Sequence, residues 1–221
     1  MPRPSSALPA AGQRPSTRDL ILEAAGRRFA ERGFAGVSVR QIAAEAGLRN
    51  QASLYHHFKN KRALYEAALT RGIEPIVAMV AASRDDAGVE STLIDRLVEY
   101  LAEHPHLPRL IQRVGLEDLR YLPSVVPRVI RPLYAEGLKA LARMAPDWNA
   151  ADLPHLAIGF YHLIFGYFAS ASLLEAALES DWTAPAAVRR QQAFLRAALL
   201  RLARGEGPES GPPARRPRRR A

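Results

Sequence analysis

Residues 38–57 read SVRQIAAEAGLRNQASLYHH, and this stretch decides how the N-terminal part of the chain folds. Ser38 and Gln41 have the spacing of a capping box, in which each side chain binds the other residue's backbone N–H at the start of a helix. Gly47 is expected to end that helix, because glycine readily adopts the left-handed conformation found there. Asn50 can cap a further short helix. The stretch therefore predicts two short helices joined by a tight turn.

This pattern is typical of a helix-turn-helix, whose second helix places its N-terminal side chains in the DNA major groove. The apolar side chains expected to hold the two helices together are Val39, Ile42, Ala43, Leu48 and Leu54. The polar side chains expected to face outward are Arg40, Arg49, Asn50, Gln51 and Ser53. The segment is therefore a candidate for sequence-specific contact with DNA.

Helical periodicity also dominates on both sides of this segment, with no alternating strand pattern. Thr17 is expected to cap a first helix that ends at Gly33, and Lys61 opens a helix that runs to about Ala82. Five further helices are expected near residues 89–103, 107–121, 124–145, 150–179 and 185–204. The predicted fold class is all-α, with an N-terminal three-helix head and a larger C-terminal helical body.

The predicted domain boundaries follow from these helices and from composition. Residues 17–64 form the head, with a linking helix to about residue 82, and residues 65–204 form the body. Residues 1–16 and 205–221 are rich in Pro, Gly, Ser and Arg, and we expect a disordered basic arm and a disordered basic tail.

The net charge of +9 is concentrated in parts of the chain. Residues 17–72 carry ten basic and five acidic side chains, whereas residues 73–203 are slightly acidic. A basic head on a weakly acidic body suits contact with phosphate groups. The chain has no cysteine, which excludes disulfides and cysteine-ligated metals, and its N-terminus lacks the apolar segment of a secretory signal. A cytoplasmic location is expected.

One stretch has the length and apolar character of a membrane span, because residues 153–174 contain no charged side chain. Pro154, His155 and His162 interrupt its apolar character, and no cluster of basic residues flanks it. A helix buried in an oligomer core is the preferred interpretation, and no membrane partner is predicted.

Residues 17–64, TRDLILEAAGRRFAERGFAGVSVRQIAAEAGLRNQASLYHHFKNKRAL, resemble the signature of the TetR family of transcriptional regulators. The matching residues are Ile21, Leu22, Ala24, Ala25, Phe29, Gly33, Phe34, Ser38, Val39, Ile42, Ala43, Ala46, Gly47, Leu54, Tyr55, His57, Phe58, Lys61 and Leu64. The sequence departs from the family pattern in two ways. Arg28 stands where the family usually has an apolar residue, and the spacing from Gly47 to Tyr55 is one residue longer than usual.

The resemblance implies that Ser38, Tyr55 and Lys61 contact phosphate, which hydroxyl groups, lysine and a helix N-terminus all favour. Base reading would fall to Arg49, Asn50, Gln51 and Ser53, since arginine can bind guanine and an amide can bind adenine through two hydrogen bonds. Arg40 is expected to face DNA as well. His57 and Phe58 are interpreted as packing residues.

The resemblance also implies that the body is a ligand-binding and dimerisation domain. The helices near 150–179 and 185–204 would pair with those of a second copy. On the first of them Gly159, Gly166 and Ser170 share a face, where they would either admit a partner helix or relieve crowding within the subunit. Candidate residues for an effector pocket are Met79, Tyr100, Tyr121, Tyr134, Phe160, His162, Phe165 and Phe168.

Catalytic and metal-binding interpretations are weaker. Asp152, His155 and His162 could share a helix face, but a histidine on an apolar face is more often a hydrogen-bonded core residue than a metal ligand. No metal or cofactor is predicted. No nucleophile, zinc-protease or phosphate-binding motif occurs in the sequence, so an enzyme is not expected.

The resulting hypothesis is a homodimeric, sequence-specific DNA-binding regulator, a repressor that a small-molecule effector releases from a near-palindromic operator. A second hypothesis is a DNA-binding dimer regulated by a protein partner. A third is a helical small-molecule or lipid-binding protein whose head has lost DNA binding. Steeply salt-dependent binding to a palindrome would separate the first two from the third.

Overall fold

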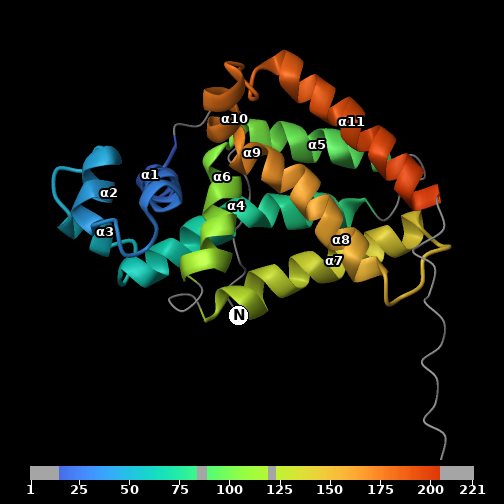
Figure 1. Cartoon of the computed structure of the whole chain (residues 1–221). Coiled ribbons are helices and arrows are strands. Elements are labelled where there is room, and N and C mark those ends of the chain that lie inside the picture. The colour runs from blue at the N-terminus through green and yellow to red at the C-terminus, as the bar shows by residue number, and fades with distance from the viewer. Residues whose placement is uncertain (1–14, 84–88, 119–122, 205–221) are drawn as a thin grey trace, which may run out of the picture.

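The computed structural model describes residues 15–83, 89–118 and 123–204, and these ranges form helices and connecting turns without a strand (Figure 1). The predicted all-α fold is confirmed. Apart from residues 15 and 16, the predicted arm and tail lie outside the described residues, and so does Tyr121.

The N-terminal helices are α1 (Thr17–Arg32), α2 (Val39–Glu45), α3 (Ala52–Tyr55) and α4 (Lys61–Ala82). The body contains α5 (Val89–Glu103), α6 (His106–Arg113), η1 (Val114–Asp118), η3 (Val126–Ile130), α7 (Arg131–Met144), α8 (Leu153–Tyr161), η4 (His162–Gly166), α9 (Tyr167–Ala169), α10 (Ala171–Leu178) and α11 (Pro185–Arg204), where η denotes a π-helical turn. In Figure 1 α2 and α3 lie at one edge of the molecule, and α4 leads from them into the body.

The first helix begins one residue earlier than Thr17 would place its cap. Ser16 is the N-cap: its hydroxyl oxygen accepts the backbone N–H of Asp19 at 3.2 Å, and the Asp19 carboxylate accepts that of Ser16 at 3.2 Å. This reciprocal pair satisfies two backbone N–H groups that have no partner within the helix. A cap at Thr17 could not form such a pair, because the residue three positions later is Leu20, whose side chain has no acceptor. The predicted end at Gly33 is confirmed, with φ of 68°.

The helix-turn-helix follows its sequence signals. Ser38 and Gln41 form the predicted capping box, with the Gln41 side-chain oxygen accepting the Ser38 N–H at 2.8 Å. Gly47 has φ of 74° in the turn, a conformation that glycine adopts without strain. The Asn50 side-chain oxygen accepts the Ser53 N–H at 3.1 Å and so caps the first turn of α3.

The predicted helices 107–121, 124–145 and 150–179 are each interrupted. All three contain a π-helical turn, whose extra residue disturbs a straight helix. In addition, the 150–179 segment bends by 60° between Leu153–Ala169 and Ala171–Leu178. The prediction of one continuous helix there was wrong.

Within the described residues, no single helix is long and apolar enough to cross a membrane. The bent pair Leu153–Ala169 and Ala171–Leu178 passes that test by length and composition alone.

An aromatic cluster joins the head to α4. Tyr65 of α4 stacks on Phe29 of α1 with ring centroids 4.4 Å apart, and Phe34 lies 5.7 Å from Tyr65. Phe29 and Tyr65 are fully buried. Since α4 also carries Ile73 and Ile76 into the body core, one helix connects the two parts of the molecule.

Candidate DNA interface and effector-binding body

The predicted DNA-contacting side chains lie at the start of α2 and within it, in the turn between α2 and α3, on α3 and at the start of α4. Val39, Ile42 and Leu54 are buried and hold α2 and α3 against the head, as predicted. The exposed polar or aromatic residues are Ser38, Arg40, Arg49, Asn50, Gln51 and Tyr55, and those with intermediate exposure are Ser53 and Lys61. Tyr55 is 49% exposed, so its ring and hydroxyl are accessible to a partner.

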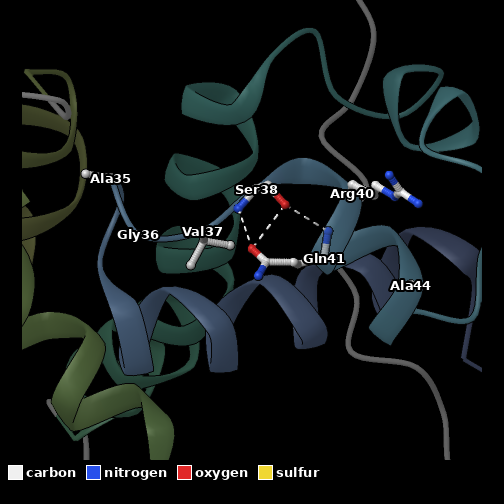
Figure 2. A pocket seen from close by; sticks show the side chains of 7 residues that line it. All are labelled: Ala35, Gly36, Val37, Ser38, Arg40, Gln41 and Ala44. Atoms are coloured by element: carbon white, nitrogen blue, oxygen red, sulfur yellow. Dashed lines mark hydrogen bonds between the residues drawn. The ribbon is translucent and has the colours of Figure 1, made fainter.

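A shallow hollow of about 490 Å³ lies where α1 and α2 connect. It is lined by Ala35, Gly36, Val37, Ser38, Arg40, Gln41 and Ala44. Figure 2 shows Ser38 and Gln41 hydrogen-bonded to each other there, with the Arg40 side chain directed away from them. The Ser38 hydroxyl donates to the Gln41 side-chain oxygen at 3.0 Å, so its proton is engaged in the cap.

The start of α4 is fixed by two contacts. The Asn60 side-chain oxygen accepts the Ala63 N–H at 2.8 Å, which caps the helix. The Lys61 ammonium group lies 4.5 Å from the centre of the Phe34 ring, a cation–π distance. Lys61 is therefore held at the junction of the head and α4 beside the exposed surface of the head.

His57 does not pack as the sequence predicted. Phe58 is buried, but His57 is exposed, and the two ring centroids are 6.5 Å apart. The tight turn between α3 and α4 directs one of the two adjacent rings inward and leaves the other in solvent. The residue type of His57 did not predict this exposure, because histidine is found both in protein cores and on protein surfaces.

Arg28 departs from the family pattern, and the structure gives it a partner. Glu45 of α2 binds Arg27 at 2.9 Å and also binds Arg28, so one carboxylate joins two arginines of α1. Burial raises the pKa of Glu45, but the hydrogen bonds and charges of Arg27 and Arg28 outweigh burial and hold the pKa below its usual value. Sequence analysis missed this contact because the partners are 17 and 18 positions apart.

The predicted pocket residues separate into three groups. Met79, Phe160, Phe165 and Phe168 are buried in the core. Tyr134 and His162 are exposed and lie near Tyr161. The centre of the Tyr161 ring is 6.5 Å from that of Tyr134, 5.1 Å from that of His162 and 5.0 Å from that of Phe165. Tyr161 was not predicted, although its i, i+4 spacing to Phe165 would have placed both on one helix face.

Tyr100 lies away from this aromatic group. Its hydroxyl donates to the Gly72 carbonyl oxygen of α4 at 2.9 Å, and its ring stacks on His104 at 4.3 Å. Burial raises the pKa of Tyr100 to about 12, so this hydroxyl remains a donor. Tyr100 thus contributes to the contact between the body and the linking helix.

Asp152, His155 and His162 do not form a three-residue metal-binding cluster in the described chain. His155 is exposed at the start of α8, and the Asp152 carboxylate accepts from Asn149.

The C-terminal helices carry most of the exposed large apolar side chains. Six of the ten such residues in the described chain lie on α8, α10 and α11: Ile158, Leu173, Leu178, Phe194, Leu200 and Leu202. The inward face of α11 binds α5, where Arg196 forms an ion pair with Asp95 at 2.6 Å. A Cβ added at Gly159 or Gly166 would meet no described atom within 4 Å, so these glycines do not relieve crowding within the subunit.

Comparison with known proteins agrees with this architecture. Residues 21–68 match the family described as bacterial regulatory proteins, tetR family. The HTH-type transcriptional repressor SCO4008 of Streptomyces coelicolor is 37% identical over 102 residues, which are 46% of this chain and 51% of that protein. The aligned region thus spans about half of that relative. The "Probable HTH-type transcriptional regulator YttP" of Bacillus subtilis is 31% identical over 155 residues, 67% of this chain and 72% of that protein.

The fold is shared with solved structures at low sequence identity. The TetR family regulator PfmR of Thermus thermophilus superposes with a TM-score of 0.60 and 21% identity, over 84% of this chain and 96% of that one. These relatives are named as transcriptional regulators and not as enzymes. The alignment with YttP extends well beyond the helix-turn-helix, and the family match covers the head itself. The chain therefore belongs to the tetR family of bacterial regulatory proteins.

Proposed function

We propose that the protein is a homodimeric transcriptional repressor that binds a near-palindromic operator through α2 and α3 and releases it when a small molecule enters the body. The observation that carries the proposal is the helix-turn-helix of a tetR family member, with polar side chains on its exposed surface. This function rests on sequence-specific contact between those side chains and DNA.

The proposed contacts divide into positioning and reading. Tyr55 and Lys61 bind phosphate and set the orientation of the head on the duplex, and Ser38 joins them when its hydroxyl proton turns from Gln41 to a phosphate oxygen. Arg49, Gln51 and their neighbours on α3 read base edges in the major groove. The capping role of Asn50 engages its side-chain oxygen with Ser53, which favours Gln51 for bidentate contact with adenine.

The proposed dimer forms through α8, α10 and α11. Their exposed apolar side chains and the open space beside Gly159 and Gly166 support a close helix partner from a second copy. Two-fold symmetry would place the two recognition helices roughly 34–36 Å apart, which matches successive major grooves of a palindrome.

The proposed effector enters among the body helices. The buried side chains of the described body are aliphatic and aromatic apart from Gln191 and Gln192, which supports an effector with a largely apolar skeleton. Its coupling to DNA is reciprocal: operator DNA must weaken effector binding by the same factor, typically about 5–150-fold, by which the effector weakens operator binding.

The experiment that tests this function selects duplexes from a random pool with the full chain and measures their binding across salt concentrations. A near-palindromic site with a steep salt dependence is expected. Absence of sequence preference would overturn the repressor assignment. Compounds are then screened for release of the selected duplex. If no compound weakens binding to the selected duplex but a partner protein does, regulation by a protein partner is favoured.

A further inference from the structure

The first two residues of α6 fit against two glycines on different helices. His106 packs on Gly26 of α1, where an added Cβ would lie 3.1 Å from the imidazole Nε2. Leu107 packs on Gly72 of α4, where an added Cβ would lie 2.4 Å from the leucine Cδ1. Adjacent side chains of one body helix therefore occupy the space left by glycine on the first head helix and on the linking helix.

Polar contacts close the same junction on either side. Tyr100 of α5 donates its hydroxyl to the Gly72 carbonyl oxygen at 2.9 Å. At the other end of α6, Arg113 donates to the carbonyl oxygens of Ala30 and Glu31 at 3.3 and 3.2 Å. These carbonyl oxygens belong to the last turn of α1, where no backbone N–H of the same helix is placed to donate to them. In Figure 1 α6 lies directly beside α1.

His106 is the titratable side chain within this junction. Glu23 and Arg27 of α1, Arg109 of α6 and His104 before α6 are the charged or titratable groups that act on it. Burial is the main cause that lowers the pKa of His106. The positive charges of Arg27 and Arg109 and the neighbouring His104 lower it further, whereas the negative charge of Glu23 raises it. From α5, Tyr100 stacks on His104.

On the α4 side of the junction, Arg71 is paired with Asp19 of α1. The surroundings as a whole thus favour a neutral imidazole at residue 106.

We propose that His106 is a positioning residue that holds the DNA-binding head at its angle to the body, and that protonation of its imidazole loosens this contact and lowers operator affinity. The inference rests on the proposed DNA-binding function. The imidazole is partly buried against Gly26, and burial disfavours its charged form, so protonation favours separation of α6 from α1. Because α1 packs on α4 through Phe29 and Tyr65, that separation changes the orientation of the whole head.

The direction of the pH dependence follows from the lowered pKa of His106. The junction is fully stable above the ordinary histidine pKa of 6.5 and is weakened as the pH falls below it, because the separated state binds the proton more readily.

The test compares the wild type with His106→Phe, which keeps a neutral ring, and with His106→Gln in case the larger ring does not fit. Affinity for a duplex selected from a random pool is measured at constant ionic strength between about pH 8 and about pH 5.5. Relative to His106→Phe, the wild type should lose affinity on acidification, because the separated state binds the proton more readily than the packed junction does.

His155→Gln is the matched control, since His155 is exposed at the start of α8 and is not among the groups that act on His106. It should retain the pH response of the wild type. Gly26→Ala should lower affinity at every pH by displacing the imidazole. An identical pH dependence in the wild type and both His106 variants would overturn the proposal.

Urea unfolding of the same proteins over the same pH range provides a readout that requires no DNA. The wild type should lose stability on acidification more than His106→Phe does, and equal losses would overturn the proposal. If no duplex is selected but this difference is observed, the DNA-binding function fails while the protonation-sensitive junction stands. If a duplex binds with the same pH profile in every variant, only the role of His106 fails.

Discussion

At the scale of single residues, Arg28 shows how an unusual side chain is accommodated. Arg28 is partly exposed on α1, and Glu45 supplies its partner from α2. The same carboxylate binds Arg27, so α1 and α2 are joined by a three-residue ionic contact as well as by apolar packing. This contact fixes the first helix of the helix-turn-helix against the head.

We expect Glu45→Gln to lower the free energy of unfolding by about 1 kcal/mol at neutral pH, as for a partly exposed ion pair of good geometry. The lowered pKa of Glu45 means that its contribution is complete above the usual value of 4.5 and is lost as the pH falls through the folded-state pKa. Urea unfolding at several pH values should therefore show the two proteins converging in acid. Glu31→Gln is the control, because Glu31 meets Arg28 only at 3.7 Å and is 51% exposed. An equal effect of both variants would contradict the assignment.

The proposed DNA contacts give a second prediction at this scale. Lys61→Ala and Tyr55→Phe should weaken binding to the selected operator and to random DNA by a similar factor, because phosphate contacts carry no sequence information. Gln51→Ala should reduce discrimination between operator and random DNA, by about 1–3 kcal/mol for a lost bidentate base contact. Titrations at fixed salt measure both quantities. Unchanged discrimination in Gln51→Ala would remove this residue from base reading.

At the scale of elements, the helices of the body are interrupted where they pack around one another. The segment from residue 153 to 178 contains a π-helical turn and a 60° bend at Ser170, and α4 continues through Pro75 without ending. Gly72 of α4 serves as the packing site of Leu107. A glycine within a helix can thus admit a neighbour instead of permitting a bend.

Two glycine substitutions test this interpretation. In an open helical position, alanine stabilises relative to glycine by up to about 1 kcal/mol. Gly137→Ala in α7 should show that gain, because an added Cβ would meet no described atom of another element within 4 Å. Gly72→Ala should instead destabilise the protein, since displacing the buried Leu107 costs about 1–3 kcal/mol. Chemical denaturation measures both, and equal stabilisation would show that Leu107 moves away freely.

At the scale of the whole molecule, the apolar surface of the C-terminal helices supports the proposed dimer. We expect Phe194→Glu to shift the protein toward monomer in light scattering at micromolar concentration, and to weaken operator binding with it, because a buried unpaired carboxylate opposes association. Phe194 is 54% exposed.

Leu116→Glu is the control for this prediction, since Leu116 is 83% exposed but lies on η1, outside the proposed interface. It should leave the mass unchanged. A wild type that is strictly monomeric, or a Phe194→Glu protein that remains dimeric, would contradict the assignment.

The sequence by itself determined the all-α class, the helix-turn-helix with its caps at Ser38 and Asn50, and the full extent of α4. These features depend on contacts within a few residues, such as the Ser38–Gln41 capping box, and local spacing reports such contacts directly. Only the tertiary structure decided that His57 is exposed, that Glu45 joins two arginines, and that Tyr100 contacts α4 instead of a pocket. It also decided that His106 and Leu107 meet Gly26 and Gly72. The exposure of His57 depends on how the turn after α3 packs, and the other features are contacts between different helices. Helical periodicity contains no information about which side chains of two helices face one another.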